Sequence, residues 1–237
     1  QRSGDLPDDY SLNWRGDCYD EIELIQQRNG QYDFDPAIIN RYMDAGDTST
    51  FVLPISSAMT IMAWGGIEFG DGFNASDQMD SLLETLRWHA DWCIAAHPEP
   101  NVFCGQIGDG APSHIAWGPV EPDVPQPEDG YYYPLEWVWW LNAENPGSEP
   151  AGESAAFLAA ASILFEETDP DYAATLLQHA RELYAFADTY RGTYTDSIPE
   201  IDNYYDSWTG YFDELAWSAA WIYRATGEQT YLDQAEA

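Results

Sequence analysis

One stretch of the chain decides the fold, the run Ile55-Ser56-Ser57-Ala58-Met59-Thr60-Ile61-Met62-Ala63-Trp64. Drawn as a helix, this run is apolar on nearly every side, which is typical of a helix that is buried on most sides. We predict a helix from Pro54 to about Phe69, ended by the residues from Gly70 to Asn74. The run from Ala155 to Phe165 has the same character and predicts a second buried helix.

The helices predicted beside these two runs are apolar on one side only. We expect Ser76 to cap the first of them, which ends at His97-Pro98. Asp169-Pro170 is a strong start signal for another, which runs to Tyr190. A further pair, from Thr209 to Ala225 and from Thr230 onward, repeats this pattern of an apolar helix followed by a one-sided one. Helices that alternate in this way indicate an inner ring enclosed by an outer ring, a toroid of helix pairs.

A solenoid of tetratricopeptide-like repeats is the main alternative to the toroid. The segment from Tyr172-Ala173 through Tyr184 resembles one such repeat. A repeat array has a fixed period and short connections, whereas this chain has no fixed period and very long loops. The sequence therefore favours the toroid.

Two long segments lie outside the helices, residues 5–53 and residues 98–152. Asp, Gly, Pro and Asn occur throughout the first, and the second holds most of the prolines and many of the tryptophans. Loops of this length usually have a function. Within the second, the run from Tyr131 to Trp140 is either a buried strand or a surface for a ligand, and the sequence leaves both open.

The first long segment delivers two acids, Asp44 and Asp47, in the motif Met43-Asp44-Ala45-Gly46-Asp47-Thr48. Small residues between the acids allow a sharp turn that points both carboxylates into one space. Such a pair can hold and deprotonate a water molecule. The alternative is an Asx-type turn whose acids only cap the helix that begins near Pro54.

Composition limits the partners. The 237 residues are enough for one large domain, and 8 basic against 42 acidic residues give a net charge of 8 − 42 = −34. Such a charge disfavours nucleic acid and anionic lipid as partners and suits a neutral ligand, although acidity alone also increases solubility.

The three cysteines, Cys18, Cys93 and Cys104, match neither a disulfide framework nor a metal spacing. No apolar run has the length of a membrane span, and we expect the chain to be a fragment cut at both ends.

The chain resembles the inverting cellulases of glycoside hydrolase family 9 through most of its length. The matching motifs follow the family's order: Gln1-Arg2-Ser3-Gly4, Trp14-Arg15-Gly16-Asp17, Asp44-Ala45-Gly46-Asp47, Pro100-Asn101-Val102, Gln106-Ile107-Gly108-Asp109-Gly110, Pro146-Gly147-Ser148, Ala151-Gly152-Glu153, Ala185-Asp188-Tyr190-Arg191-Gly192 and Ser207-Trp208-Thr209-Gly210-Tyr211 with Asp213-Glu214-Leu215. The resemblance implies an all-α fold, the (α/α)6 barrel, with an open cleft for β-1,4-glucan at one end. Residues 1–237 would be an incomplete, N-terminal portion of that single catalytic domain.

The resemblance also implies residue roles. Asp47 would be the catalytic base and Asp44 would help to hold the water, while the family's acid, a glutamate near the end of the domain, matches no position here. Sugar rings stack on aromatic side chains, and the implied cleft residues are His114, Trp117, Tyr204, Tyr205 and Trp208. Structural calcium would lie at Thr209, Gly210, Asp213 and Glu214, with no organic cofactor; the alternative is a helix start capped by Thr209.

The expected protein is therefore a secreted, extracellular endo-β-1,4-glucanase that inverts the anomeric configuration, with no nucleic-acid or membrane partner. We expect the 237 residues alone to be inactive and poorly folded, because they lack the acid and leave apolar helix faces without partners. Two alternatives stay open, a non-catalytic glucan-binding relative and a helical-repeat interaction module. The first would bind glucan without cleaving it, and the second would not bind carbohydrate.

Overall fold

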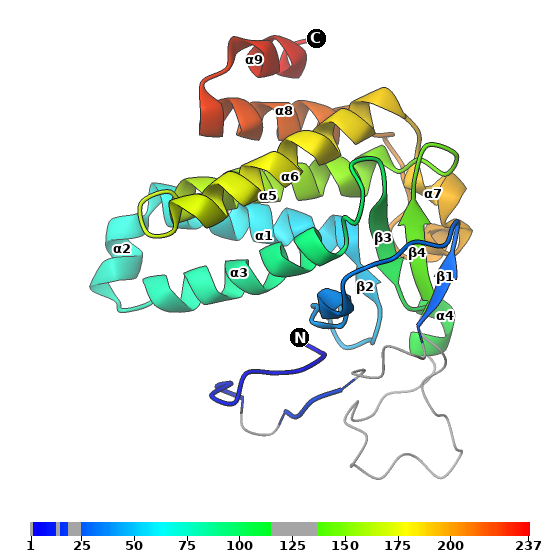
Figure 1. Cartoon of the computed structure of the whole chain (residues 1–237), viewed down its shortest axis with the longest axis horizontal. Coiled ribbons are helices and arrows are strands. Elements are labelled where there is room, and N and C mark those ends of the chain that lie inside the picture. Colours follow the sequence, from blue (N-terminus) through cyan, green and yellow to red (C-terminus); the bar gives the residue numbers. More distant parts are fainter. Residues whose placement is uncertain (1, 13–14, 19–24, 115–136) are drawn as a thin grey trace.

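The computed structural model describes residues 2–12, 15–18, 25–114 and 137–237. Helices predominate in this part of the chain, and a small sheet lies at one end of them (Figure 1). The helices are α1 (Val52–Glu68), α2 (Gly70–Ala75), α3 (Met79–Ala95), α4 (Gly110–Ser113), α5 (Ser148–Phe165), α6 (Pro170–Thr189), α7 (Tyr194–Ser197), α8 (Phe212–Thr226), α9 (Gln229–Ala235) and the 3-10 turns η2 (Pro36–Ile39) and η3 (Pro199–Asn203). The strands are β1 (Gln26–Arg28), β2 (Thr50–Phe51), β3 (Phe103–Ile107) and β4 (Trp137–Leu141).

The long helices form two layers, as the alternation in the sequence predicts. In the inner layer, α5 lies between α1 and α8 and packs against both. The outer helices α3, α6 and α9 each pack on the inner helix that precedes them in the chain, and Figure 1 shows α6 running alongside α5. The predicted pairing of inner with outer helices is therefore confirmed for the described residues.

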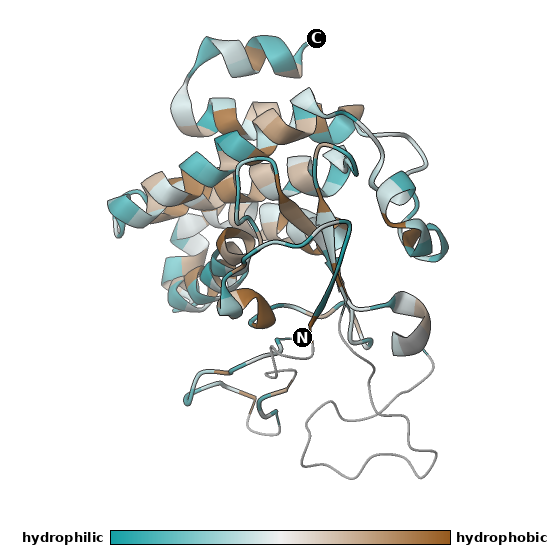
Figure 2. Ribbon diagram, turned by 45° about the vertical axis from the view of Figure 1, so that its right-hand side comes forward, coloured by the Kyte–Doolittle hydropathy of each residue, from teal (hydrophilic) through white to brown (hydrophobic). Residues whose placement is uncertain are grey.

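Helix α5 is the centre of the core. Its segment from Ala155 to Ala161 is completely buried and consists mostly of alanine. Small side chains allow neighbouring helices to approach closely, which suits a helix that is covered on every side. The outer helix α6 instead buries one stripe that includes Ala173, Leu176, Ala180 and Leu183. Hydrophobic colour in Figure 2 accordingly marks the inner elements and the middle of the sheet, while most of α9 is hydrophilic.

Helix boundaries show where sequence signals succeed and fail. Asp169 caps α6 as predicted, since its carboxylate accepts a hydrogen bond from the backbone N–H of Tyr172 at 3.3 Å. The prediction that Ser76 caps α3 is wrong. Its hydroxyl donates to the carbonyls of Gly72 and Phe73 and so ends α2, a short helix that we predicted as a break. Helix α3 starts three residues later, at Met79.

The four strands form one sheet in the order β1-β4-β3-β2. Strand β4 pairs antiparallel with β3 and parallel with β1, and β2 pairs antiparallel with the end of β3 through Thr50 and Ile107. Of the run from Tyr131 to Trp140, the described residues belong to β4, where Val138 and Trp140 are fully buried. This part of the run is a buried strand, and the rest lies outside the described residues.

Two further findings concern the core. Cys18, Cys93 and Cys104 are all buried in the core. The predicted burial of the run from Ile55 to Trp64 on most sides is wrong, because Ile61 is 61% and Trp64 41% exposed. The Trp64 ring meets Trp217 and Trp221 edge-on at the margin of the inner layer. Within the described residues, no helix is both long and apolar enough to cross a membrane.

Candidate active site

The two acids of the Asp-Ala-Gly-Asp motif lie in a closed turn directly before β2. The N–H of Asp44 donates to the carbonyl of Ser49 at 2.8 Å, and the N–H of Asp47 donates to the carbonyl of Asp44 at 3.0 Å. Ala45 adopts a φ of 33°, a conformation that a small residue tolerates best. The turn thus brings both carboxylates to one side, as the spacing predicts.

Strand pairing fixes this turn next to the Gln106–Gly110 motif. A Cβ atom on Gly108, whose φ is 91°, would lie 3.0 Å from the Ser49 hydroxyl and 3.2 Å from the Ser49 Cα. Only glycine therefore allows the two loops to lie in contact. The hydroxyl of Ser49 also hydrogen-bonds the hydroxyl of Ser113 at 3.1 Å, which ties the turn to α4.

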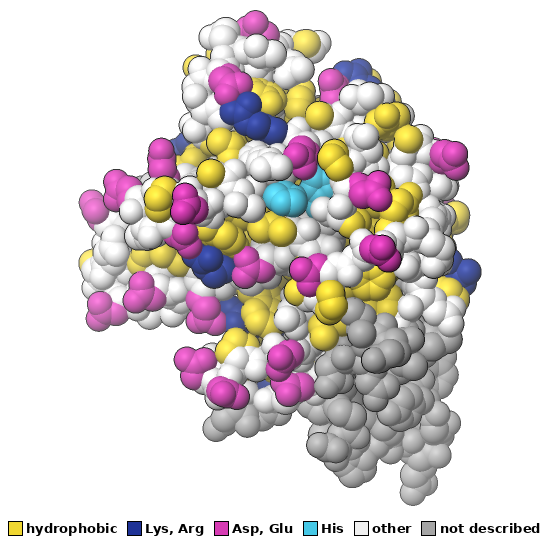
Figure 3. All heavy atoms as spheres, viewed as in Figure 1, with side chains coloured by type: hydrophobic (Ala, Val, Ile, Leu, Met, Phe, Trp, Pro, Cys, Tyr) yellow, Lys and Arg dark blue, Asp and Glu magenta, His cyan; other side chains and the backbone are white. Residues whose placement is uncertain are grey.

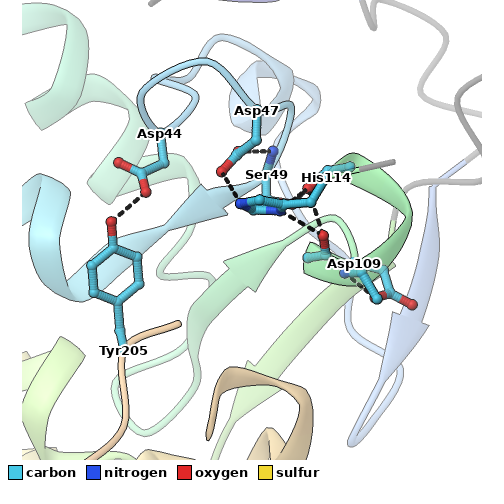
Figure 4. Close-up of polar contacts among 9 residues, drawn as sticks. Asp44, Asp47, Ser49, Asp109, His114 and Tyr205 are labelled. Carbon is cyan, nitrogen blue, oxygen red and sulfur yellow. Dashed lines mark hydrogen bonds and ion pairs between the residues drawn. The ribbon is translucent and has the colours of Figure 1, made fainter. Parts of the chain in front are cut away.

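Asp47 is nearly buried and has a different neighbour at each oxygen. The Ser49 N–H donates to Oδ1 at 2.7 Å, and His114 Nε2 lies 3.6 Å from Oδ2 (Figure 4). Burial, opposed by the Ser49 N–H and reinforced by the charge of Asp44, raises the pKa of Asp47 to about 6. The Asx-type turn expected as the alternative is present, but the acids do not cap α1, whose N-cap is Phe51 with no side-chain hydrogen bond.

His114 is oriented by its other ring nitrogen. Nδ1 lies 2.7 Å from the carbonyl of Gly110, which can only accept, so Nδ1 carries a proton and Nε2 is directed at Asp47. The imidazole stacks on Tyr204 with ring centroids 4.7 Å apart, and Tyr204 stacks in turn on Phe51 at 5.4 Å. A polar ring backed by aromatic rings is thereby held beside the candidate base.

Asp44 is bound by a residue from a distant segment. The hydroxyl of Tyr205 donates to Asp44 Oδ2, and Figure 4 shows the two side chains facing each other. The Tyr205 ring also packs against Phe51 with centroids 5.2 Å apart. The loop after η3 therefore comes to the acids from 161 positions further along the chain.

The structure brings together most of the predicted site residues. Asp44, Asp47, His114, Tyr204 and Tyr205 form one cluster, whereas Trp208 is 84% exposed. Trp117 lies outside the described residues. The roles that the resemblance implies for these residues stay predictions.

The contact between Gln106 and Glu200, beside this cluster, was not predicted. Glu200, in η3, accepts a hydrogen bond from the Gln106 side chain. Burial and the neighbouring carboxyl of Asp109 raise the pKa of Glu200 to about 8. The same two acids and Asp47 contribute to the raised pKa of Tyr204, after burial. The Gln106–Gly110 motif marked one partner in the sequence, but no local signal marked Glu200.

The acids at the start of α8 form a second site. Asp213 and Glu214 lie in the first helical turn, as predicted, but Thr209 is not the N-cap, because the helix begins at Phe212 after Tyr211. The Thr209 hydroxyl instead donates to Asp213 Oδ2 at 3.4 Å. Burial and then Asp213 raise the pKa of Glu214 to about 8, and Glu214 Oε2 is buried without a hydrogen-bond partner.

Comparisons with known proteins agree with this geometry. The sequence model of "Glycosyl hydrolase family 9" matches residues 1–237. Among characterised relatives, endoglucanase B of Cellulomonas fimi is 41% identical over 240 residues, which cover 100% of this chain and 21% of the relative. Endoglucanase 15 of Arabidopsis thaliana is 42% identical over 233 residues, covering 98% of this chain and 44% of the relative.

Solved structures give the same result. The endoglucanase of the termite Nasutitermes takasagoensis superimposes with a TM-score of 0.87 and 40% identity over 100% of this chain and 50% of that protein. Endoglucanase CelQ of Clostridium thermocellum, solved with cellobiose and cellotriose, has a TM-score of 0.77 and 30% identity over 100% of this chain and 34% of that protein.

The chain thus spans half or less of each of these four proteins. These neighbours are (α/α)6-barrel enzymes, and the predicted fold class, a partial all-α barrel, is confirmed. The four-stranded sheet is present in addition to these helices. This chain belongs to glycosyl hydrolase family 9.

Proposed function

We propose that the protein hydrolyses β-1,4-glucosidic bonds of cellulose or a related β-glucan with inversion of configuration. The observation that carries the proposal is the turn from Asp44 to Ser49, which holds two carboxylates side by side with a separate donor for each. An inverting hydrolase needs a carboxylate that activates water and a second carboxylic acid across the sugar. The turn supplies the first of these.

Asp47 is the proposed base. It must be ionised to accept a proton from water, and its pKa of about 6 leaves it ionised at neutral pH while keeping it more basic than an ordinary aspartate. The Ser49 N–H and His114 orient its two oxygens. Asp44, held by the Tyr205 hydroxyl, is the proposed second ligand of the attacking water. No residue of this chain is assigned as the acid.

The proposed glucan surface is aromatic. Tyr204 and Tyr205 lie beside the acids, and Trp208 projects from the same loop with 84% of its surface exposed. Apolar faces of glucose rings stack on such side chains. The cello-oligosaccharides bound to the CelQ endoglucanase belong to the same substrate class.

Calcium is proposed at the start of α8, where the residues fit a hard cation. Asp213 and Glu214 are adjacent, Glu149 of α5 is close enough to raise the pKa of Glu214, and Glu214 Oε2 lacks a partner. Asp213 and Glu214, with the backbone carbonyls of Thr209 and Gly210, would hold the ion. The ion would neutralise this group of acids and fix the loop that carries Trp208. Secretion is proposed as well, from the polymeric nature of the substrate.

The test is hydrolysis of cellohexaose by the full-length protein, followed by NMR of the anomeric protons. Release of the α-anomer supports inversion, and release of the β-anomer contradicts it. Binding to cellulose without any product would favour a non-catalytic relative. The expectation that residues 1–237 alone are inactive is checked in the same assay.

A further inference from the structure

Two histidines meet on the outer layer of the molecule. His97 follows α3 and precedes β3, and His179 lies at the middle of α6. Their Nδ1 atoms are 2.8 Å apart, and the ring planes make an angle of 69°. Figure 3 shows histidine atoms gathered at one place on this face, with acidic side chains around them.

A carboxylate completes the group. Glu182 is three positions after His179 on the same helix, so both side chains project from one face of α6. One ligand atom from each of His97, His179 and Glu182 lies within 4.8 Å of the other two. Within the described residues, this is the only group of three histidine, cysteine or acidic side chains arranged so closely.

Both imidazoles are in the form that binds metal. Burial, followed by the proximity of His179, lowers the pKa of His97 to about 4. Burial also lowers the pKa of His179. At neutral pH both rings are therefore uncharged, and both Nδ1 lone pairs become available to a cation once the proton between them moves to Nε2 of its own ring. Glu182 adds one negative charge.

The surroundings hold one ligand firmly and leave the others accessible. His97 is 5% exposed, its ring packs edge-on against Phe103, and its backbone N–H donates to the carbonyl of Ile94 at 3.1 Å. His179 and Glu182 are only half-buried, and Glu182 accepts a hydrogen bond from Gln178 at 3.0 Å. Two nitrogens bound to one tetrahedral zinc lie about 3.4 Å apart. A small opening of the histidine pair and a rotation of Glu182 away from Gln178 would therefore be sufficient.

We propose that His97, His179 and Glu182 form a zinc site with three protein ligands and water as the fourth. Imidazole nitrogens and a carboxylate are ligands that suit Zn²⁺, whereas Ca²⁺ prefers oxygen ligands alone. The ion would link α6 to the connection between α3 and β3. This inference does not depend on the proposed hydrolase function.

The zinc site and the candidate active site lie at opposite ends of one strand. Phe103 at the start of β3 packs on His97, whereas Ile107 at its end pairs with Thr50 beside the acidic turn. Four residue steps along a strand span about 13 Å. Zinc is therefore expected to change stability and to leave glucan hydrolysis unchanged.

The test is titration of full-length protein with Zn²⁺ and with Co²⁺, using a form without a polyhistidine tag. The parent should bind one equivalent of zinc at this site, and Co²⁺ should give the intense visible absorption of a four-coordinate ion. His179→Ala and Glu182→Gln change half-buried ligands and should fold normally, and His97→Ala completes the set. His179→Ala should weaken zinc binding by at least about 100-fold, because loss of even an outer-shell partner commonly costs about 10–100-fold.

Gln178→Ala is the matched control. It lies one position before His179 and touches Glu182 without being a ligand, so its zinc affinity should stay close to that of the parent. The proposal is overturned if the parent binds no zinc at micromolar concentration. It is equally overturned if His179→Ala, folded by circular dichroism, binds zinc and Co²⁺ like the parent.

Discussion

Two pairs of acids each lie within a single turn, Asp44 with Asp47 and Asp213 with Glu214. The surroundings of the two pairs differ. In the first pair each acid has a donor, the Ser49 N–H at Asp47 and the Tyr205 hydroxyl at Asp44. In the second pair, Glu214 Oε2 is buried without any donor. The pKa of Asp47 is raised to about 6, while that of Glu214 is raised to about 8.

This difference separates two kinds of acidic site. Hydrogen bonds from neutral donors keep a buried carboxylate ionised without cancelling its charge, which suits a base that must attract a proton. A buried carboxylate without donors is stable as an anion only beside a cation, which suits a metal site. The two pairs are connected by the segment from Tyr204 to Asp213, so changes in one can be measured against the other.

The largest expected effect is on catalysis at the first pair. Asp47→Asn in the full-length protein should lower kcat by about 10²–10⁴-fold, the usual contribution of a general base, and leave cellulose binding nearly intact. Asp44→Asn should cost less, because Asp44 only helps to hold the water. Kinetics on cellohexaose and a cellulose-binding assay check both. Near-normal turnover of Asp47→Asn would mean that the base is another residue.

The raised pKa of Asp47 gives a prediction for pH. Activity should increase as pH rises through about 6, where Asp47 becomes ionised. Because folding raises this pKa, protonated Asp47 is favoured in the folded protein, and its stabilising effect is lost as pH rises through about 6. Asp47→Asn should therefore melt no lower than the parent at pH 7.5, and it should lack the rise in activity. A large drop in its melting temperature would assign Asp47 a structural role.

Calcium should affect the second pair alone. An ion bound only by the folded state stabilises it by about 2.7 kcal/mol when free calcium is a hundred times its dissociation constant. A chelator should therefore lower the melting temperature of the parent but not that of Asp213→Ala. Asp44→Asn is the matched acidic control and should respond like the parent. If the parent does not respond, or if Asp213→Ala responds equally, these acids are ordinary residues of a first helical turn.

A smaller effect is expected for Tyr205, which belongs to the loop between the pairs but donates to the first. Tyr205→Phe removes one hydrogen bond to a charged group, an interaction of about 1.5–3 kcal/mol, and should lower kcat/KM by at least about 10-fold. Chelation should shift its melting temperature as it does in the parent. Loss of the calcium response in this variant would show that the two pairs are not independent.

The smallest effects concern tryptophans. Trp208→Ala should weaken cello-oligosaccharide binding by about 2–13-fold, equivalent to the 0.5–1.5 kcal/mol of one aromatic stacking contact. With Trp208 84% exposed, stability should change by less than about 0.5 kcal/mol. Trp64→Ala should instead lower stability, by less than the roughly 3–5 kcal/mol of a fully buried tryptophan, and spare affinity. Calorimetry for both variants separates the two roles, and a sharp loss of stability in Trp208→Ala would remove it from the cleft.

Much of this architecture follows from local sequence patterns. Alanine-rich α5 and one-sided α6 are distinguishable by periodicity, and Asp169-Pro170 marks a helix start without any tertiary information. The acidic turn was predictable for the same reason, since small residues separate its acids. The prediction that Ser76 caps α3 failed because its hydroxyl can hydrogen-bond either the last turn of one helix or the first turn of the next. The sequence does not distinguish these two possibilities.

The remainder depends on contacts between distant segments. Tyr205 reaches Asp44 across 161 positions, Gln106 reaches Glu200 across 94, and His97 meets His179 across 82. No periodicity or spacing in the sequence predicts these three contacts. They arise because β2 and β3 bring two long loops together and because α6 packs beside the end of α3.

Chemical rescue of Asp47→Ala tests the central claim most directly. If Asp47 is the base that activates water, its removal leaves a space from which a small anion such as azide can attack the anomeric carbon without needing a base. We predict that azide restores turnover of cellohexaose by full-length Asp47→Ala and yields the α-glycosyl azide, whereas Asp44→Ala gives no such product. Absence of the azide product from a folded Asp47→Ala protein, or formation of the β-glycosyl azide, would contradict the assignment of Asp47 as an inverting base.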